Sequence, residues 1–292
     1  AEAADLQSAG FDRSPTPPIG MGIFLLHMKD VNQKRLNQEK IVSLLNLNKN
    51  LKVNLEIFDQ IDSTNSYLLK KEQSINTLNI CVAEMQTKGK GRSGKIWESP
   101  KNSNIYLSIG TLLNKDISEL DGFSILIALN ICRALKNIYK IRAKVKWPND
   151  LYLKGKKFGG ILIETKVVNN KLSLVIGIGL NVFMKSNEFI DQEWTSLHIE
   201  NPLLKINRDL LISEIISEIS KELPIFLKEG FKFYREDFEK LNILKNKKVI
   251  VSNYFSGNCI ALNVNDDGSL NLLVDDIEKK VSSGEVSLKI QK

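Results

Sequence analysis

The segment QTKGKGRSGKIW at residues 86–97 combines glycines and cations in a spacing that suits an anionic ligand. Gly89, Gly91 and Gly94 have the G-x-G-x-x-G spacing of a dinucleotide-binding loop, which needs a strand before it and a helix after it. A strand is expected before this loop, but Pro100 and several turn-forming residues follow it where the helix should begin. The context therefore argues against a nicotinamide or flavin site.

The same loop carries four cations on a backbone that glycine makes flexible, so it is able to approach an anion closely. These cations are Lys88, Lys90, Arg92 and Lys95. Taken alone, the segment fits a solvated surface loop equally well, and other segments must decide between the two interpretations.

The segment VKWPNDLYL at residues 145–153 supplies further polar side chains at a strand end. Pro148 fixes its own φ and ends the strand, which holds Asn149 and Asp150 in a rigid bend. Together with Lys146, these side chains are of the types that bind a triphosphate and its Mg²⁺. An ordinary β-turn with a polar tip is the alternative.

The segment KKFGGILIE at residues 156–164 places two glycines inside an apolar strand pattern. Gly159 and Gly160 indicate close approach of a ligand or of another backbone, and Lys157 lies beside them. A β-bulge explains the same pattern, so this segment adds to the argument only in combination with the others.

The periodicity of the chain predicts an α+β fold that holds these segments at strand ends and in turns. Helices are expected at residues 35–46, after the capping residues Ser63 and Thr64, and at 117–140 and 207–240. Strands are expected at 55–61, 79–87, 102–113 and 142–147, with an antiparallel meander over 151–182 and a small β-barrel module from about residue 246. The central sheet is expected to be mixed or antiparallel, with helices around it.

Composition limits the chemistry that the chain can perform. The net charge of +7 favours anionic partners, although it also fits a lysine-rich composition without function. The two histidines, His27 and His198, argue against a histidine-based zinc site or a Ser-His-Asp triad. Three widely spaced cysteines favour a reducing, cytoplasmic location, and no apolar run is long enough to span a membrane.

Taken in order, the segments IDSTNSYL, AEMQTKGKGRSGKIWESP, NIYLSI, VKWPNDLYL, KKFGGILIE and VIGIGLNV resemble the catalytic domain of bacterial biotin protein ligases. The resemblance covers about residues 55–290. It implies a catalytic domain at 55–243 related to class II synthetases and an SH3-like domain at 244–292. Residues 21–54 are expected to be a short helical segment, and residues 1–20 a disordered leader.

The resemblance implies a two-step reaction in which biotin and ATP form biotinyl-5′-AMP, with Mg²⁺ as the metal. Biotin then passes to a lysine of the biotin carboxyl carrier protein of acetyl-CoA carboxylase. Family members often pair through their sheets when the adenylate is bound, so the resemblance allows a homodimer, while the sequence does not fix the oligomeric state. The short N-terminal segment leaves no room for a complete winged helix-turn-helix, so no DNA binding is expected.

The resemblance also implies roles for individual residues. Those expected at the biotin site are Ser63, Thr64, Asn65, Gln86, Gly89, Lys90, Gly91, Arg92, Lys157, Gly159 and Gly160, with Ile161 and Leu162 forming an apolar wall. Those expected at the ATP site are Arg92, Lys95, Trp97, Lys146, Asn149, Asp150, Asn181 and Trp194. Arg92, Lys146 and Lys157 are expected to be catalytic, and Asp150 to bind magnesium.

One residue departs from the family pattern, because Lys90 stands where the family commonly has arginine. The charge is kept but the bidentate fork of arginine is lost, which leaves the role of position 90 open. Two other functions are weighed against the biotin ligase. They are a lipoate or other acyl-protein ligase of related fold, and a nucleic-acid-binding regulator that uses the basic surface.

Overall fold

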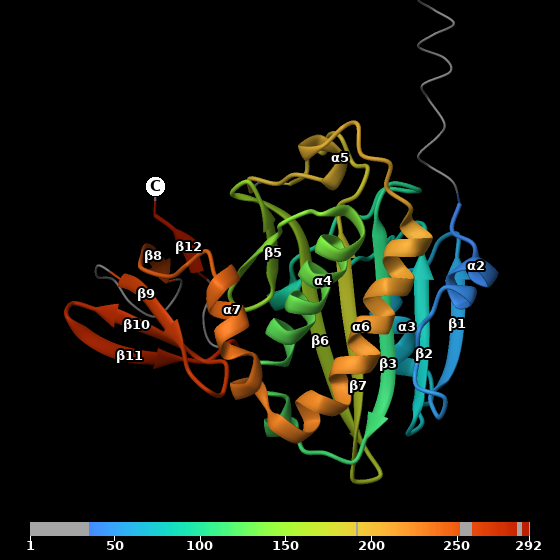
Figure 1. The fold of residues 1–292 in the computed structure, drawn as a ribbon, viewed down its shortest axis with the longest axis horizontal. Coiled ribbons are helices and arrows are strands. Elements are labelled where there is room, and N and C mark those ends of the chain that lie inside the picture. The colour runs from blue at the N-terminus through green and yellow to red at the C-terminus, as the bar shows by residue number, and fades with distance from the viewer. Residues whose placement is uncertain (1–34, 191, 252–258, 285–287, 292) are drawn as a thin grey trace, which may run out of the picture.

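The computed structural model describes residues 35–190, 192–251, 259–284 and 288–291. The expected leader at residues 1–20 lies outside the described residues, as do residues 21–34. The chain forms a large sheet covered by helices and a smaller sheet beside it (Figure 1). None of the helices in the described ranges has the length and apolar composition that crossing a membrane requires.

The large sheet has seven strands in the order β1-β2-β3-β7-β6-β5-β4. Only β1 and β2 pair in parallel, and every other neighbouring pair is antiparallel, so the expected mixed sheet is confirmed. The strands are β1 (Lys52–Phe58), β2 (Thr77–Ala83), β3 (Ile105–Leu113), β4 (Lys144–Lys146), β5 (Asp150–Leu153), β6 (Lys156–Val168) and β7 (Lys171–Leu180).

Helices cover both faces of this sheet, and the alternation of side chains along β2 explains why. Ile80 and Val82 belong to the main core, on the face that α4 and α6 cover. Cys81 between them points to the other face and packs in a separate cluster with Leu68 of α3 and Val175. The helices are α2 (Gln38–Ser43), α3 (Thr64–Lys70), α4 (Phe123–Tyr139), α5 (Leu197–Glu200), α6 (Arg208–Glu229) and α7 (Arg235–Leu241).

The smaller sheet contains five antiparallel strands in the order β11-β10-β9-β8-β12. These strands are β8 (Lys247–Val251), β9 (Cys259–Val264), β10 (Leu270–Val274), β11 (Ile277–Val281) and β12 (Leu288–Ile290). Trp147, which is 1% exposed, donates a hydrogen bond of 2.8 Å from Nε1 to the Gly268 carbonyl oxygen near this sheet. The turn after β4 is thereby tied to the C-terminal strands.

Several expected elements are shorter than the periodicity indicates or are interrupted. The strand expected at 79–87 stops at Ala83, because the chain then turns into the glycine loop. The helix expected at 117–140 begins as a 3₁₀ turn (Ile117–Leu120) and restarts after Gly122, which has a φ of 75°. Helical structure over 207–240 is interrupted at Gly230, which has a φ of 70°. Glycine is the residue that most readily adopts this left-handed region.

Helix α2 is shorter than the expected 35–46 and packs on β1 of the large sheet and on α6. The Leu36 backbone N–H donates to Glu84 at 2.8 Å. Glu84 also pairs with Arg208 at 2.6 Å, and both side chains are almost fully buried. The end of β2, next to the glycine loop, is therefore held by ionic contacts from α6.

Candidate active site

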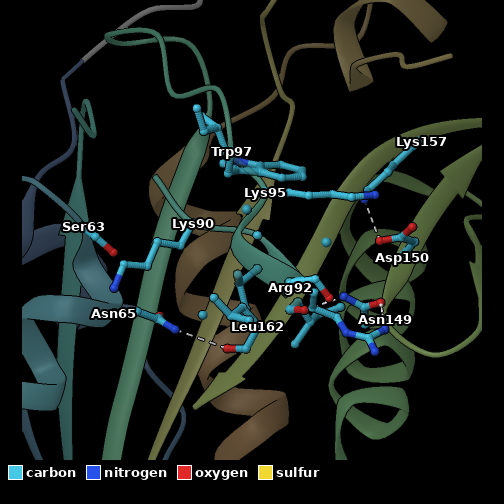
Figure 2. Close-up of a pocket in the computed structure, with 18 of the residues that line it drawn as sticks. Ser63, Asn65, Lys90, Arg92, Lys95, Trp97, Asn149, Asp150, Lys157 and Leu162 are labelled. Carbon is cyan, nitrogen blue, oxygen red and sulfur yellow. Dashed lines mark hydrogen bonds and ion pairs between the residues drawn. The ribbon is translucent and has the colours of Figure 1, made fainter. Parts of the chain in front are cut away.

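A cavity of about 510 Å³ opens where the glycine loop, the Pro148 turn and strands β6 and β7 meet (Figure 2). Thr64 and Asn65 of α3 and Lys289 of β12 are among the residues that line it. It is lined by Ser63, Thr64, Asn65, Gln86, Lys90, Gly91, Arg92, Ser93, Lys95, Ile96, Trp97, Asn149, Asp150, Lys157, Gly160, Ile161, Leu162, Gly177, Ile178, Gly179, Gln192, Gly284 and Lys289.

The wall of the cavity on β6 and β7 is a strip of glycines, on which the Trp97 indole lies. Gly160 and Gly179 are cross-strand partners. A Cβ on Gly179 would lie 2.5 Å from the Trp97 ring, and one on Gly160 would lie 3.5 Å from it. Gly159 instead faces Leu180 and does not line the cavity. The glycines thus allow another group to approach the strands closely, as expected. In this structure that group is the Trp97 side chain.

The glycine loop folds back on itself over this strip. The Trp97 N–H donates to the Gly89 carbonyl oxygen at 3.0 Å, and the Gly91 N–H donates to the Lys95 carbonyl oxygen at 2.7 Å. Between them, residues 92–94 form a single 3₁₀ turn. The glycines are therefore followed by a 3₁₀ turn and then by strand β3, and not by the α-helix that a dinucleotide-binding loop requires.

Arg92 extends from this loop toward the Pro148 turn. Its guanidinium donates to Asn149 Oδ1 at 3.2 Å and to the Ser283 carbonyl oxygen. Burial lowers the pKa of Arg92, and the nearby carboxylate of Asp150 partly opposes this effect. The glycine loop, the turn and the C-terminal segment therefore meet at one arginine.

Two hydrogen bonds join the Pro148 turn to strand β6. The Trp147–Pro148 peptide is cis. Asn149 Nδ2 donates to the Ile161 carbonyl oxygen at 2.7 Å, and the Ile161 N–H donates to the Asn149 carbonyl oxygen at 3.0 Å. These bonds fix the turn against β6 and point Asp150 into the cavity.

Cations gather at this end of the cavity, which we call the cationic end and define as Arg92, Lys95, Asp150, Lys157 and Lys289. Lys157 Nζ lies 2.7 Å from Asp150 Oδ1 and 5.6 Å from the centre of the Trp97 ring. Figure 2 shows Lys95, Lys157 and Arg92 on the same side of the cavity as Asp150. Of the side chains that line the described cavity, five are cations and one is a carboxylate.

Lys146 lies near this cluster without lining the cavity. Burial lowers its pKa, Asp150 opposes that shift, and Lys157, Lys95 and Lys289 add to it. The lysine also lies 5.9 Å from the centre of the Tyr152 ring. It therefore contributes positive potential from behind the site.

The opposite end, which we call the polar end, consists of Ser63, Thr64, Asn65 and Gln86. Ser63 caps α3, as expected, by accepting a hydrogen bond from the Ser66 N–H. Gln86 Oε1 accepts from the Thr64 N–H at 2.9 Å and lies 3.1 Å from Thr64 Oγ1. Three of these residues are at most 4% exposed, namely Ser63, Thr64 and Asn65.

The structure does not bring every expected site residue to the cavity. Gly89, Lys146, Gly159, Asn181 and Trp194 do not line it. Asn181 Nδ2 donates to the Thr195 carbonyl oxygen at 3.1 Å, and the backbone at Trp194 pairs with that at Lys157. These two residues thus lie in a segment that adjoins the cationic end.

Other lining residues were not expected from the sequence, namely Ser93, Ile96, Gly177, Ile178, Gly179, Gln192, Gly284 and Lys289. The alternating glycines of VIGIGLNV were a usable signal for Gly177 and Gly179, because glycine in a strand indicates close approach. Lys289 lies more than one hundred residues further along the chain, and nothing in its neighbourhood marks it.

The fold is α+β, with a mixed sheet, and its cavity is polar at one end and cationic at the other. Such a cavity suits a polar small molecule that carries negative charge. The family model of the biotin/lipoate A/B protein ligase family matches residues 57–181. The chain is 34% identical over 235 residues to the bifunctional ligase/repressor BirA of Escherichia coli, with 78% of this chain and 72% of that protein covered. This chain therefore belongs to the biotin/lipoate A/B protein ligase family.

Another relative and a solved structure are named biotin protein ligases. Chloroplastic biotin–protein ligase 1 of Arabidopsis thaliana is 28% identical over 199 residues, covering 66% of this chain and 53% of that one. Among solved structures, the biotin protein ligase from Aquifex aeolicus in complex with biotin and ATP has a TM-score of 0.70 and 28% identity. That match covers 82% of this chain and 99% of the other. The resemblance to biotin protein ligases is thus confirmed.

Proposed function

We propose that this enzyme joins biotin to ATP and then transfers biotin to a carrier protein. In the first step, an oxygen of the biotin carboxylate attacks the α-phosphorus of ATP, and the bond to the β-phosphate breaks to release pyrophosphate. In the second step, a lysine amine attacks the acyl carbon of biotinyl-5′-AMP. The bond to AMP breaks, AMP leaves with the electron pair, and the amine loses a proton.

The observation that carries this proposal is the surplus of positive charge at one end of a cavity whose other end is formed chiefly by hydroxyl and amide groups. The reaction requires a carboxylate and a triphosphate to approach each other, and cations offset their repulsion. A pair of opposite unit charges in contact near a protein surface contributes about 4 kcal/mol. No general base is needed in the first step, because the carboxylate is already ionised, so positioning and charge suffice.

In this proposal the heterocycle of biotin lies at the polar end, and its carboxylate points toward Arg92 and Lys157. The apolar chain between them crosses Ile161 and Leu162, which line the middle of the cavity. The phosphates of ATP lie at the cationic end near Lys95 and Lys289. The Trp97 Nε1, which is buried without a hydrogen-bond partner among the described residues, supports the presence of a ligand acceptor there.

The cationic end offers a single carboxylate, so it suits Mg²⁺ only if phosphate oxygens of the substrate also coordinate the ion. Asp150 is the single carboxylate among the lining residues, and no group of three or more His, Cys, Asp or Glu side chains suited to a metal occurs in the described ranges. Mg²⁺ at nucleotide sites is commonly held by one or two carboxylates, substrate phosphates and water. Asp150 would hold the ion, which when bound offsets phosphate charge.

Lipoate ligation is the second candidate, because the family model covers both activities. The polar end favours biotin, since amide and hydroxyl groups suit a urea, whereas the dithiolane ring of lipoate has no strong hydrogen-bonding group. A nucleic-acid-binding role remains the third alternative. We predict that this chain does not bind operator DNA, and salt-dependent DNA binding in the absence of biotin and ATP would contradict that prediction.

The remaining expectations belong to the same proposal. We infer that residues 55–243 form the catalytic domain and that residues 244–292 form an SH3-like domain, which the five antiparallel strands of the smaller sheet support. The protein partner is inferred to be the biotin carboxyl carrier protein, and the resemblance allows a homodimer. The buried thiols of Cys81, Cys132 and Cys259 support the expected cytoplasmic location.

The experiment is isotope exchange between pyrophosphate and ATP, followed by mass spectrometry of a carrier domain. The proposal predicts exchange that depends on biotin and not on lipoate, and a carrier whose mass increases by one biotinyl group. Exchange with lipoate alone would favour the second candidate. Exchange without any acid, or none at all, would contradict the proposal.

A further inference from the structure

Ser108 lies beneath the polar end, in the middle of β3, and its side chain is fully buried. Its Oγ lies 2.6 Å from Asn65 Oδ1 and 2.7 Å from Thr64 Oγ1. Ser108 does not itself line the cavity. Any effect of Ser108 on a ligand must therefore pass through these two neighbours.

Glu164 on β6 fixes the amide orientation of Asn65. Asn65 Nδ2 donates to Glu164 Oε2 at 2.8 Å and to the Leu162 carbonyl oxygen at 3.3 Å, and both partners are acceptors. The amide nitrogen must therefore face Glu164, which leaves Oδ1 facing Ser108. Gly177 makes this position possible, because a Cβ there would lie 2.3 Å from Asn65 Oδ1.

The hydroxyl groups at this end supply fewer hydrogens than the contacts require. Three oxygen–oxygen contacts lie in a row: Asn65 with Ser108, Ser108 with Thr64, and Thr64 with Gln86 Oε1 at 3.1 Å. Asn65 Oδ1 and Gln86 Oε1 only accept, so the two hydroxyls provide two hydrogens for three contacts. One contact is left without a hydrogen.

The contact that lacks a hydrogen is the one between Thr64 and Gln86, at the surface of the cavity. Asn65 Oδ1 is buried and its partner in this row is Ser108, so leaving that contact unmade is costly and Ser108 donates to it. The Thr64 hydroxyl hydrogen is then assigned to the shorter of its two remaining contacts, which is 2.7 Å to Ser108 Oγ and not 3.1 Å to Gln86 Oε1, and this uses the second hydrogen. The contact between Thr64 and Gln86, which both line the cavity, remains open to a donor from the ligand.

We propose that Ser108 and Glu164 are positioning residues that make the polar end accept hydrogen bonds and thereby select ligands with N–H groups. This inference rests on the proposed function, because it assigns the selection to the urea of biotin. A cyclic urea offers two N–H groups, whereas a dithiolane ring offers none. Discrimination by a buried polar group left unpaired is stronger than discrimination by an apolar pocket.

Three variants test the row of contacts. In Ser108→Ala, the Thr64 hydroxyl is free to donate to Gln86 and fills the open contact, so the dissociation constant of biotin rises about tenfold. In Glu164→Leu, Asn65 loses the acceptor that holds its amide, and a similar increase is expected. Glu164→Gln retains an acceptor oxygen at the same place and keeps the dissociation constant within about threefold of the wild-type value.

The informative readout is the ratio of dissociation constants for biotin methylated on a urea nitrogen and for biotin itself. A general loss of packing weakens both ligands alike and leaves the ratio unchanged. The proposal predicts that the ratio decreases about fivefold to tenfold in Ser108→Ala and Glu164→Leu. The dissociation constant of ATP and the melting temperature, measured alongside, separate this effect from damage to the fold.

Unchanged biotin affinity, or an unchanged ratio, in variants of a wild-type protein that binds biotin would overturn this inference and leave the proposed function intact. A wild-type protein that does not bind biotin at all would overturn both. If Ser108→Ala does not fold, the comparison of Glu164→Leu with Glu164→Gln tests the inference by itself. Glu164 is only partly buried, so both of its variants are expected to fold.

Discussion

The polar end and the cationic end of the cavity differ in how the protein satisfies their polar groups. At the polar end, Thr64, Asn65 and Gln86 bond chiefly to other side chains of the protein. At the cationic end, Asp150 is the one carboxylate among the described lining residues, and it stands against four cations, Arg92, Lys95, Lys157 and Lys289. The first end is complete except for one hydrogen, whereas the second lacks several negative charges.

This difference separates two tasks of the proposed reaction, which are the recognition of the neutral ring and the stabilisation of the reacting anions. A preformed network of short, buried hydrogen bonds recognises a neutral ring by geometry, at little cost in ordering. An incomplete set of charges is stabilised only when anions arrive, so it favours the reacting state over the empty one. We therefore expect changes at the cationic end to affect rate and changes at the polar end to affect biotin affinity.

The largest effect is expected for Lys157→Ala at the cationic end. Lys157 contacts Asp150 and lies over Trp97, so its loss removes a charge from the place where we propose that the carboxylate meets the α-phosphate. Loss of one such stabilising group lowers kcat by about 10²–10³-fold. Pyrophosphate exchange measures kcat, and the biotin dissociation constant should change much less. Lys156→Ala, on the exposed side of the same strand, is the matched control.

Arg92→Gly should allow the adenylate to leave. The guanidinium joins the glycine loop to Asn149 and to the Ser283 carbonyl oxygen, and glycine replaces none of these contacts. A charged hydrogen bond contributes roughly 1.5–3 kcal/mol, so release of labelled biotinyl-5′-AMP should be about tenfold to hundredfold faster. Lys88→Gly, at an exposed position of the same loop, controls for added flexibility. Equal release by the two variants would refute the role of Arg92.

Gly177→Ala tests the polar end by steric means. The new Cβ would lie 2.3 Å from Asn65 Oδ1, so Asn65 must move or the sheet must shift. Overpacking of this kind costs about 1–3 kcal/mol, and we expect a lower melting temperature and about tenfold weaker biotin binding. ATP binding should be nearly unchanged. Ser173→Ala, in the same strand, removes a buried hydroxyl without a partner in the described structure and should have little effect.

The smallest effect concerns pH. Burial lowers the pKa of Lys146, so this lysine loses its proton at a lower pH than an exposed lysine does. If the cationic form supports ATP binding, as the proposed function implies, kcat/KM for ATP should fall as the pH rises through that pKa. Arginine stays protonated throughout this range, so Lys146→Arg should move the fall to higher pH. If kcat/KM for ATP falls at the same alkaline pH in the wild-type protein and in Lys146→Arg, the contribution of Lys146 is excluded.

The sequence predicted the polar end better than the cationic end for a physical reason. Ser63, Thr64 and Asn65 are consecutive, and helix capping marks them locally. The α+β class, the mixed sheet, the antiparallel meander and the biotin protein ligase family were predicted and are confirmed. The roles of the individual residues remain predictions.

The cationic end was predicted incompletely because distant segments build it. Lys95, Lys157 and Lys289 come from three parts of the chain that only the tertiary fold brings together. Lys146, which was expected in the site, lies behind the cavity, because β4 directs its side chain toward Tyr152. Gly159 faces Leu180 rather than the cavity, because side chains alternate along β6 while only Gly160 points toward Trp97.

The division of the cavity into two functional ends is tested most directly by a crystal structure of this protein with biotin and a non-hydrolysable ATP analogue. The account predicts the urea ring against Thr64 and Gln86, and the carboxylate and α-phosphate between Arg92 and Lys157. A biotin ring seated among the cations, or ligands bound outside this cavity, would contradict it.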